Sequence, residues 1–254
     1  MNSFLTFVEK EWTELCRTKR LYLLLGIFAL FGMVSPILAR YMQEIISASM
    51  GKSAPILVSE PIWSDSWIQF YNNLSQMGGI SVLLLFMNSI CGEKQAKTAS
   101  LTLTKNLSPA EFLTAKFVVS VGSVLFAFLP AVLLCLGYTY YLFGYAGEWK
   151  DILTGAFIFM IFMVVLLSTV MLASTLAITS AFAAMLAFGG YLILILSTYL
   201  PMVGSLLPGA LLSSTISVIM HRSPIILFCQ IVIALAISLV CVYISINVLK
   251  HQEI

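Results

Sequence analysis

The chain is short of charge. Asp, Glu, Lys and Arg together make up 9% of its 254 residues, and hydrophobic residues make up 60%. Soluble domains carry about 25% charged residues, and a water-soluble fold of this size could not bury so much apolar surface. The shortage therefore excludes a soluble domain and predicts an integral membrane protein. The formal net charge of only +2 gives no reason to expect a nucleic-acid partner.

Catalytic groups are also scarce. The only histidines are His221 and His251, and Asp65 and Asp151 fall at the edges of apolar runs. An intramembrane enzyme needs a nucleophile with a base, or paired carboxylates, at membrane depth. An ion-coupled secondary transporter is expected to keep ionisable residues near the midplane. Both classes stay open as alternatives, but the sequence favours neither.

Two further motifs are missing. No G-x-x-x-x-G-K-[ST] phosphate loop occurs, so the chain is not expected to hydrolyse ATP by itself. The five cysteines form no C-x-x-C pair and are interpreted as small apolar fillers. Twelve methionines suggest Cu(I) handling, but only Met160 and Met163 are closely spaced within a span. We therefore predict no metal site and no cofactor bound by this chain.

What the sequence does contain is a set of long apolar runs. A helix needs about 20 apolar residues to cross the hydrocarbon core with its backbone satisfied, and the runs are continuous rather than alternating like barrel strands. They predict an all-α integral membrane protein, a single transmembrane domain over 1–254 with six transmembrane helices. The predicted spans are 21–39, 73–91, 117–136, 152–176, 181–200 and 225–249.

The basic residues are distributed unevenly between the two sides. Nine lie on the side of the amino terminus: Lys10, Arg17, Lys19, Arg20, Lys94, Lys97, Lys105, Lys116 and Lys250. Four lie on the other: Arg40, Lys52, Lys150 and Arg222. The imbalance predicts a multi-pass protein of the cell (plasma) membrane with both termini cytoplasmic. The segment 92–116 then faces the cytoplasm, and 41–72, 144–150 and 201–224 face outward.

The amino-terminal segment, 1–20, has an amphipathic pattern. Phe4, Val8, Trp12 and Leu15 recur at helical spacing, and charged residues fall on the opposite side. This predicts an elbow helix lying in the membrane interface, with Trp12 as an anchor, although a solvated helical tail is the alternative. By the same reasoning Trp63 and Trp67, four residues apart, are predicted to anchor an outer interfacial stripe.

The most informative segment is the charged island CGEKQAKTASLTLTKNLSPAEFLTAKF between the second and third spans. Thr98 can cap a short helix that exposes Leu101 and Leu103 among polar neighbours. A second helix is predicted to open at Ser108, with Pro109 in its first position and Glu111 near the positive end of its dipole. Such an island predicts a docking surface.

The order of parts is similar to that of permease subunits of ABC-2 type ATP-binding-cassette transporters. The island carries the resemblance, through residues that match a G-E-x-x-x-G-T pattern, a short Leu-rich helix and a Lys opening the third span: Gly92, Glu93, Thr98, Leu101, Leu103, Thr104 and Lys116.

The resemblance implies a cytoplasmic coupling helix that docks on a separate ABC ATPase subunit, which binds ATP and Mg²⁺. The expected coupling residues are Glu93, Thr98, Leu101, Leu103, Thr104 and Glu111. A second permease copy or a related permease is the other implied protein partner, and the bilayer supplies lipid contacts. Segment 201–224, broken at Pro208-Gly209, is expected to form a re-entrant helical pair at an outer gate.

The resemblance implies that Gln76 and Asn88 on the second span contribute to the translocation path, whereas the residues by themselves favour interhelical hydrogen bonding. Neutral, apolar and aromatic walls favour amphipathic or lipid-like cargo, and the resemblance to small ABC-2 exporters implies export of amphipathic peptides, including antimicrobial ones. Export of a drug or glycolipid, or a copper-related role, is the alternative.

Overall fold

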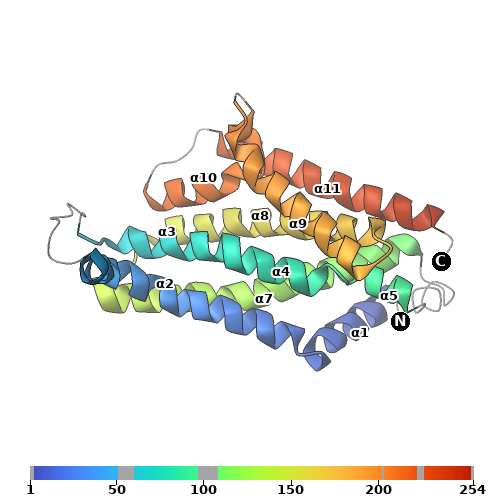
Figure 1. Ribbon diagram of the computed structural model, residues 1–254, viewed down its shortest axis with the longest axis horizontal. Helices are drawn as coiled ribbons and strands as arrows, with labels where there is room; N and C mark the ends of the chain where they lie inside the picture. Colours follow the sequence, from blue (N-terminus) through green and yellow to red (C-terminus); the bar gives the residue numbers. More distant parts are fainter. Residues whose placement is uncertain (1–2, 51–59, 97–107, 202, 222–225, 253–254) are drawn as a thin grey trace.

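The computed structural model describes residues 3–50, 60–96, 108–201, 203–221 and 226–252, and this part of the chain is a helical bundle (Figure 1). Its α-helices are α1 (Ser3–Arg17), α2 (Arg20–Met50), α3 (Trp63–Asn73), α4 (Gly79–Phe86), α5 (Cys91–Gln95), α7 (Pro109–Phe143), α8 (Trp149–Leu176), α9 (Ser180–Leu196), α10 (Ala210–Ile219) and α11 (Leu227–His251). A π-helical stretch, η1 (Leu74–Gly78), joins α3 to α4, and two 3-10 turns, η2 (Ser197–Tyr199) and η3 (Gly204–Leu206), precede α10.

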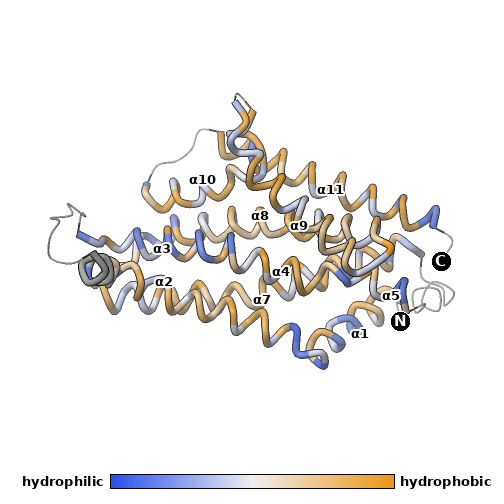
Figure 2. Tube along the Cα trace, viewed as in Figure 1, coloured by the Kyte–Doolittle hydropathy of each residue, from blue (hydrophilic) through white to orange (hydrophobic). Residues whose placement is uncertain are grey.

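The predicted membrane spans are confirmed. Within the described ranges, six helical segments are long and apolar enough to cross a membrane: Arg20–Met42, Trp63–Gln95, Pro109–Phe143, Trp149–Leu176, Ser180–Tyr199 and Leu227–His251. Figure 2 shows them hydrophobic along most of their length, with hydrophilic positions concentrated at the two ends of the bundle. The fold is therefore the all-α integral membrane architecture that the apolar runs predict.

The core lies where α8 meets α7 and the second span. Four aromatic rings, those of Phe70, Tyr71, Phe128 and Phe159, form a continuous cluster with centroids 5.2–6.3 Å apart. All four side chains are buried. Among the spans α8 is the most deeply buried, and α11 and α9 are the least. Helix α8 is therefore central, and α9 and α11 lie at the periphery of the bundle.

The second span is not a regular α-helix. Its π-helical stretch widens one turn, and the carbonyl of Ser75 there accepts a hydrogen bond from the Tyr191 hydroxyl at 2.6 Å. Gly79 makes room for the Tyr191 ring, because a Cβ at this position would lie 3.1 Å from it. Wide turns of this kind are frequent at functional sites in helices. The hydropathy of the sequence gave no sign of this irregularity.

Trp67 was predicted to anchor an outer interface, and this prediction is wrong. Its side chain is fully buried, and its indole Nε1 donates a hydrogen bond to the carbonyl of Ala146 at 2.8 Å. An amphipathic helix can turn its apolar stripe toward lipid or toward protein, and α3 packs against α2, α7 and α10. Trp63 is half-buried and stacks edge-on against Tyr145, with ring centroids 5.3 Å apart.

The segment 201–224 contains one α-helix and the turn η3 in its described part. Helix α10 packs along α8 and α3, and Gly155 of α8 lets Ile219 approach closely. The buried amide of Gln230 on α11 accepts a hydrogen bond from Ser214 at 2.7 Å and donates one to the Ser205 carbonyl at 2.7 Å. Helix α10 is thus packed against the bundle, and the turn before it is hydrogen-bonded to α11. The expected outer gate stays a prediction.

Candidate functional site

Both chain termini lie at one end of the bundle, which we call the polar end (Figure 1). It is formed by α1, α5, the first turns of α7 and the last turn of α11. Of the predicted coupling residues, the structure describes Glu93 on α5 and Glu111 on α7. The others, Thr98, Leu101, Leu103 and Thr104, lie outside the described residues.

The start of α7 confirms the predicted helix opening. Ser108 is the N-cap, Pro109 is the first helical residue, and the Ser108 hydroxyl accepts a hydrogen bond from the Glu111 backbone amide at 3.2 Å. The Glu111 carboxylate accepts in return from the Ser108 amide at 2.8 Å, which completes a capping box. A single helix runs from Pro109 through the third span, so the turn at Ser108 is fixed rigidly to that span.

Lys116 is the centre of the polar end. Its side chain is only 4% exposed, and its ammonium group lies 2.7 Å from the carboxylate of Glu11 and 2.7 Å from that of Glu93. It also lies 5.2 Å from the centroid of the Phe112 ring, within range of a cation–π interaction. One buried lysine therefore connects α1, α5 and α7.

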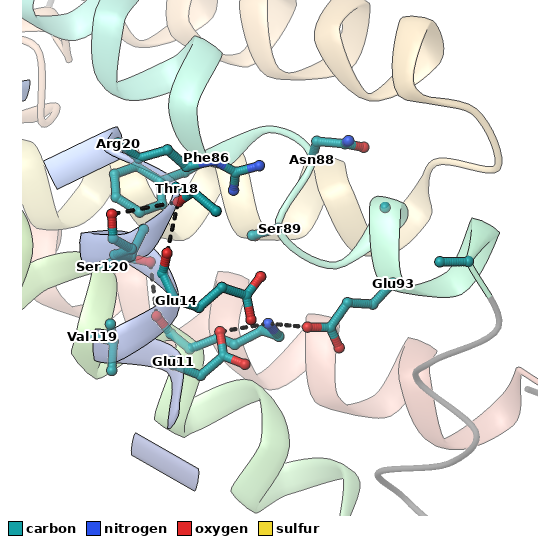
Figure 3. A pocket seen from close by; sticks show the side chains of 14 residues that line it. Glu11, Glu14, Thr18, Arg20, Phe86, Asn88, Ser89, Glu93, Val119 and Ser120 are labelled. Carbon is teal, nitrogen blue, oxygen red and sulfur yellow. Dashed lines mark hydrogen bonds and ion pairs between the residues drawn. The ribbon is translucent and has the colours of Figure 1, made fainter. Parts of the chain in front are cut away.

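Lys10 closes the network from its outer side. Its ammonium group lies 2.9 Å from Glu11, 3.2 Å from Glu14 and 3.7 Å from Glu93. Figure 3 shows Glu11 and Glu14 on one side of a cavity of about 270 Å³ and Glu93 on the other. The carboxylate oxygens of these three residues lie within 4.8 Å of one another, a spacing compatible with a cation. Two lysine ammonium groups already occupy that position, so the arrangement is an ion-pair network.

The ion-pair network shifts the pKa values of its two α1 residues Glu11 and Lys10. Burial acts to raise the pKa of Glu11, but the charge of Lys116 and hydrogen bonds from Lys116 and Lys10 outweigh it and hold this pKa below its ordinary 4.5. For Lys10, burial acts to lower the pKa, and the hydrogen bond and charge of Glu11, with Glu93 and Glu14, raise it above its ordinary 10.5. Both residues therefore stay ionised at neutral pH.

The contribution of docked α1 to the free energy of unfolding is expected to fall at low pH, through Glu11, and at high pH, through Lys10. A lowered Glu11 pKa contributes stability above its unfolded value of 4.5, and that stability is lost as the pH falls through the folded pKa. A raised Lys10 pKa contributes stability below 10.5 that is lost as the pH rises through its folded pKa. The free energy of unfolding in detergent, measured against pH, should be flat between about pH 5 and 10 and fall below about 4.5. Glu11→Gln should remove much of the acid decline; an unchanged decline would assign it to other groups.

The opposite side of α5 is held by hydrogen bonds rather than by ion pairs. The backbone amides of Ile90 and Cys91 both donate to the Ser174 hydroxyl at 3.1 Å. Lys94 donates to the carbonyl of Thr175 and, at 2.8 Å, to the side chain of Gln252 near the carboxyl terminus. The short helix α5 is thus bonded to α8 and to the end of α11 as well as to α1 and α7.

Side-chain amide and hydroxyl groups connect α5 and the residues just before it to the start of α9 by hydrogen bonds. The Gln95 side-chain amide donates to the Ile178 carbonyl at 3.1 Å, just before α9. The Ser180 hydroxyl lies 3.0 Å from Asn88 and 3.1 Å from Gln95, donating to the side-chain oxygens. Asn88, predicted to line a translocation path, therefore bonds to α9 and borders the cavity of the polar end. Gln76, the other predicted path residue, is exposed on η1.

Sequence reasoning named Glu93 and Lys116 as parts of one motif, but it did not predict that they pair, and it missed Glu11. Glu11 is four residues from both Phe7 and Leu15, so it belongs to the apolar face of α1, and a carboxylate there was a signal for a buried cation. That face packs on α7, where Phe7 and Phe112 have ring centroids 5.4 Å apart. Trp12, predicted as a membrane anchor, is half-buried with its ring edge-on to Phe126 at 6.1 Å. The elbow helix is therefore docked on protein along this face.

A bundle with six apolar spans among the described residues, closed at one end by buried ion pairs, defines a multi-pass membrane protein. The sequence matches the family model described as ABC-2 family transporter protein over residues 5–235. The chain belongs to the ABC-2 transporter family and is a transmembrane permease component of an ABC transporter, without an ATPase of its own. Membership implies partnership with an ABC ATPase subunit. A comparison with curated proteins gave no match.

Proposed function

We propose that the chain is the membrane half of an ATP-driven exporter that carries amphipathic peptides or similar hydrophobic cargo out of the cell. The polar end faces the cytoplasm, where the segment containing Thr98, Leu101, Leu103 and Thr104 docks on a separate ATPase that binds ATP and Mg²⁺. The observation that supports this most directly is the position of α5, which immediately precedes that segment and is bonded to the surrounding helices.

Movement of the docking segment would reach the spans by two connections. On its two sides lie α5, ending at Gln95, and α7, beginning at Pro109. The Glu93 carboxylate of α5 lies 2.7 Å from the Lys116 ammonium group of α7, so this ion pair joins the two flanking helices. Lys116 also pairs with Glu11, which connects both helices to α1. On the other face of α5, Lys94 and the Ser174 contacts lead to α8 and α11. A displacement of the segment would therefore move the whole polar end together.

A stripe of amides on the second span supports a path between two permease copies. Gln69, Asn72 and Asn73 on α3 follow helical i, i+3, i+4 spacing, and Gln76 comes next on η1. Asn72 and Gln76 are exposed, and Asn73 donates a hydrogen bond to the Ser35 hydroxyl of α2 at 3.0 Å. Figure 2 shows hydrophilic positions continuing along α3 into the bundle. Polar groups facing hydrocarbon are costly, so such a stripe favours a polar path or a partner subunit over lipid. A second copy facing this stripe would enclose the cargo.

The cargo is inferred from the chemistry of the spans. They contain almost no ionisable residue away from their ends, and their exposed faces are aliphatic and aromatic. A sugar or an ion would need charged or densely hydrogen-bonding walls. An amphipathic peptide needs apolar contacts with a few neutral polar groups, which the amide stripe provides.

The test uses the permease co-expressed with its partner ABC ATPase. Leu101→Glu with Leu103→Glu should abolish co-purification of the two proteins, because it places charge on an apolar contact. It should also abolish ATP-dependent uptake of a fluorescent amphipathic peptide into inside-out vesicles. Leu5→Glu is the control, since Leu5 is 59% exposed on α1 at the same end.

Each measurement tests a different part of the proposal. Unchanged co-purification and uptake in the Leu101/Leu103 variant would refute the docking role. Normal co-purification of the unmodified pair without any peptide uptake would exclude peptides as cargo and leave the coupling intact. Labelling of a cysteine at position 101 by an impermeant reagent added to intact cells would place the polar end outside and overturn the orientation.

A further inference from the structure

A groove of about 550 Å³ lies at the far end of the bundle, between the last turns of α7 and the first turn of α8. Leu136 and Ile152 supply aliphatic walls, and Tyr140, Tyr145 and Trp149 line the remainder. The three aromatic side chains are 64%, 46% and 64% exposed, which leaves their rings available to a ligand. The groove takes no part in the ion-pair network of the polar end.

The groove is shaped in advance by α3. Its floor includes Ala146, whose carbonyl accepts the hydrogen bond from buried Trp67, and Gly147, whose φ of 105° suits glycine. A Cβ at Gly147 would lie 2.8 Å from the Trp63 ring. The same ring packs edge-on against Tyr145. A site that is already ordered loses less free energy when it binds a ligand.

Two opposite charges line this groove. Glu148 and Lys150 are both exposed, and neither forms an ion pair with another described residue. The neighbouring carboxylate of Asp151 differs, because it lies 2.6 Å from His221 Nδ1. An anionic and a cationic side chain beside aromatic faces are complementary to a ligand that carries both a positive and a negative group.

The position of the groove identifies the source of such a ligand. Helix α7 ends at Phe143 and α8 begins at Trp149, so the groove crosses the level at which a spanning helix leaves the hydrocarbon. Tyr and Trp are enriched at that level. A membrane lipid presents its headgroup there, with its acyl chains directed along the span.

We propose that this groove binds one zwitterionic phospholipid, with an ethanolamine or choline headgroup. The acyl chain lies against Leu136 and Ile152. The headgroup ammonium faces Glu148 and the aromatic rings, through charge and cation–π attraction. The phosphate faces the ammonium group of Lys150. The inference depends on the chain spanning a membrane, and it does not depend on the direction of transport or on the cargo.

The test is photolabelling of the intact permease in liposomes of equal phosphatidylethanolamine and phosphatidylglycerol. An acyl-chain diazirine probe is introduced on one lipid or the other, and labelled peptides are mapped by mass spectrometry. The phosphatidylethanolamine probe should label 136–152 preferentially. Lys150→Glu and Tyr140→Ala should each lower that labelling about threefold to fivefold, as expected for exposed charge and cation–π contacts of up to about 1 kcal/mol.

Tyr141→Ala is the matched control. Tyr141 is the adjacent residue and is 84% exposed, but it does not line the groove, so labelling should be unchanged. Equal labelling by the two probes, preference for phosphatidylglycerol, or insensitivity to Lys150→Glu and Tyr140→Ala would each overturn the proposal. Displacement of the lipid probe by an amphipathic peptide at equal occupancy would assign the groove to cargo instead.

Discussion

Replacing Lys116 with methionine is expected to destabilise the protein by about 2–4 kcal/mol, because breaking a buried ion pair leaves uncompensated charge behind. The carboxylates of Glu11 and Glu93, with side chains only 10% and 15% exposed, would lose their closest and only buried cation among the described residues and keep Lys10, whose side chain is 46% exposed. Helix α1 should then undock from α7, and ATP-driven transport should fail. Unfolding of the purified protein in detergent, followed by circular dichroism, measures the first effect, and vesicle uptake measures the second.

Two companion variants separate charge from packing. Lys250→Met removes an exposed lysine from the last turn of α11 at the same end, and it should leave stability unchanged. Adding Glu11→Gln to Lys116→Met removes one of the stranded carboxylates and should restore part of the lost stability. If the single Lys116 variant were as stable as Lys250→Met, the network would be no more than a surface feature.

Replacing Gly32 with leucine should prevent α2 from packing on α7 and abolish recovery of folded protein. A Cβ at Gly32 would lie 2.5 Å from the carbonyl oxygen of Ala131 and 3.1 Å from its Cα. These are backbone atoms of a neighbouring helix, so only separation of the two helices could relieve the clash. Close approach through small residues is a main source of helix association in membranes. Gly32→Ala, with one added methyl group, should cost about 1–3 kcal/mol.

Gly26 is the matched control on the same helix, because a Cβ there would meet nothing within 4 Å. Gly26→Ala should be neutral or stabilising by up to about 1 kcal/mol, from helix propensity alone. Folded yield after gel filtration and thermal unfolding in detergent compare the variants. Equal yields for Gly32→Leu and Gly26→Leu would show that α2 and α7 do not approach as closely as the structure indicates.

The helix opening at Ser108 was predictable because its causes are local. An N-cap hydroxyl, a proline in the first position and a carboxylate three residues after the cap are adjacent in sequence, and the structure contains the resulting capping box. The spans were predictable for a similar reason, since hydrocarbon demands a continuous apolar helix wherever the chain crosses it.

The spacing of apolar residues could not predict whether an amphipathic face packs against protein or against lipid. Trp67 and Trp63 share one stripe, yet packing buries Trp67 fully and leaves Trp63 half-exposed. The apolar face of α1 indicated an interfacial helix, but its direction, toward α7 or toward lipid, depends on a neighbour more than 90 residues away in sequence. Periodicity shows that a face must be covered, and it does not identify what covers it.

The amino-acid sequence by itself determined the class of fold: its scarcity of charge and its apolar runs specify an all-α integral membrane protein, because the bilayer acts on each segment separately. The charged island added a resemblance to ABC-2 permeases, which the family match then established. Only the tertiary structure decided that Lys116, Glu11 and Glu93 form one buried network, and that Gly147, Trp63 and Tyr145 shape one groove. Coulomb energy and close packing act between groups that are near in space, and the order of residues along the chain does not state which groups those are.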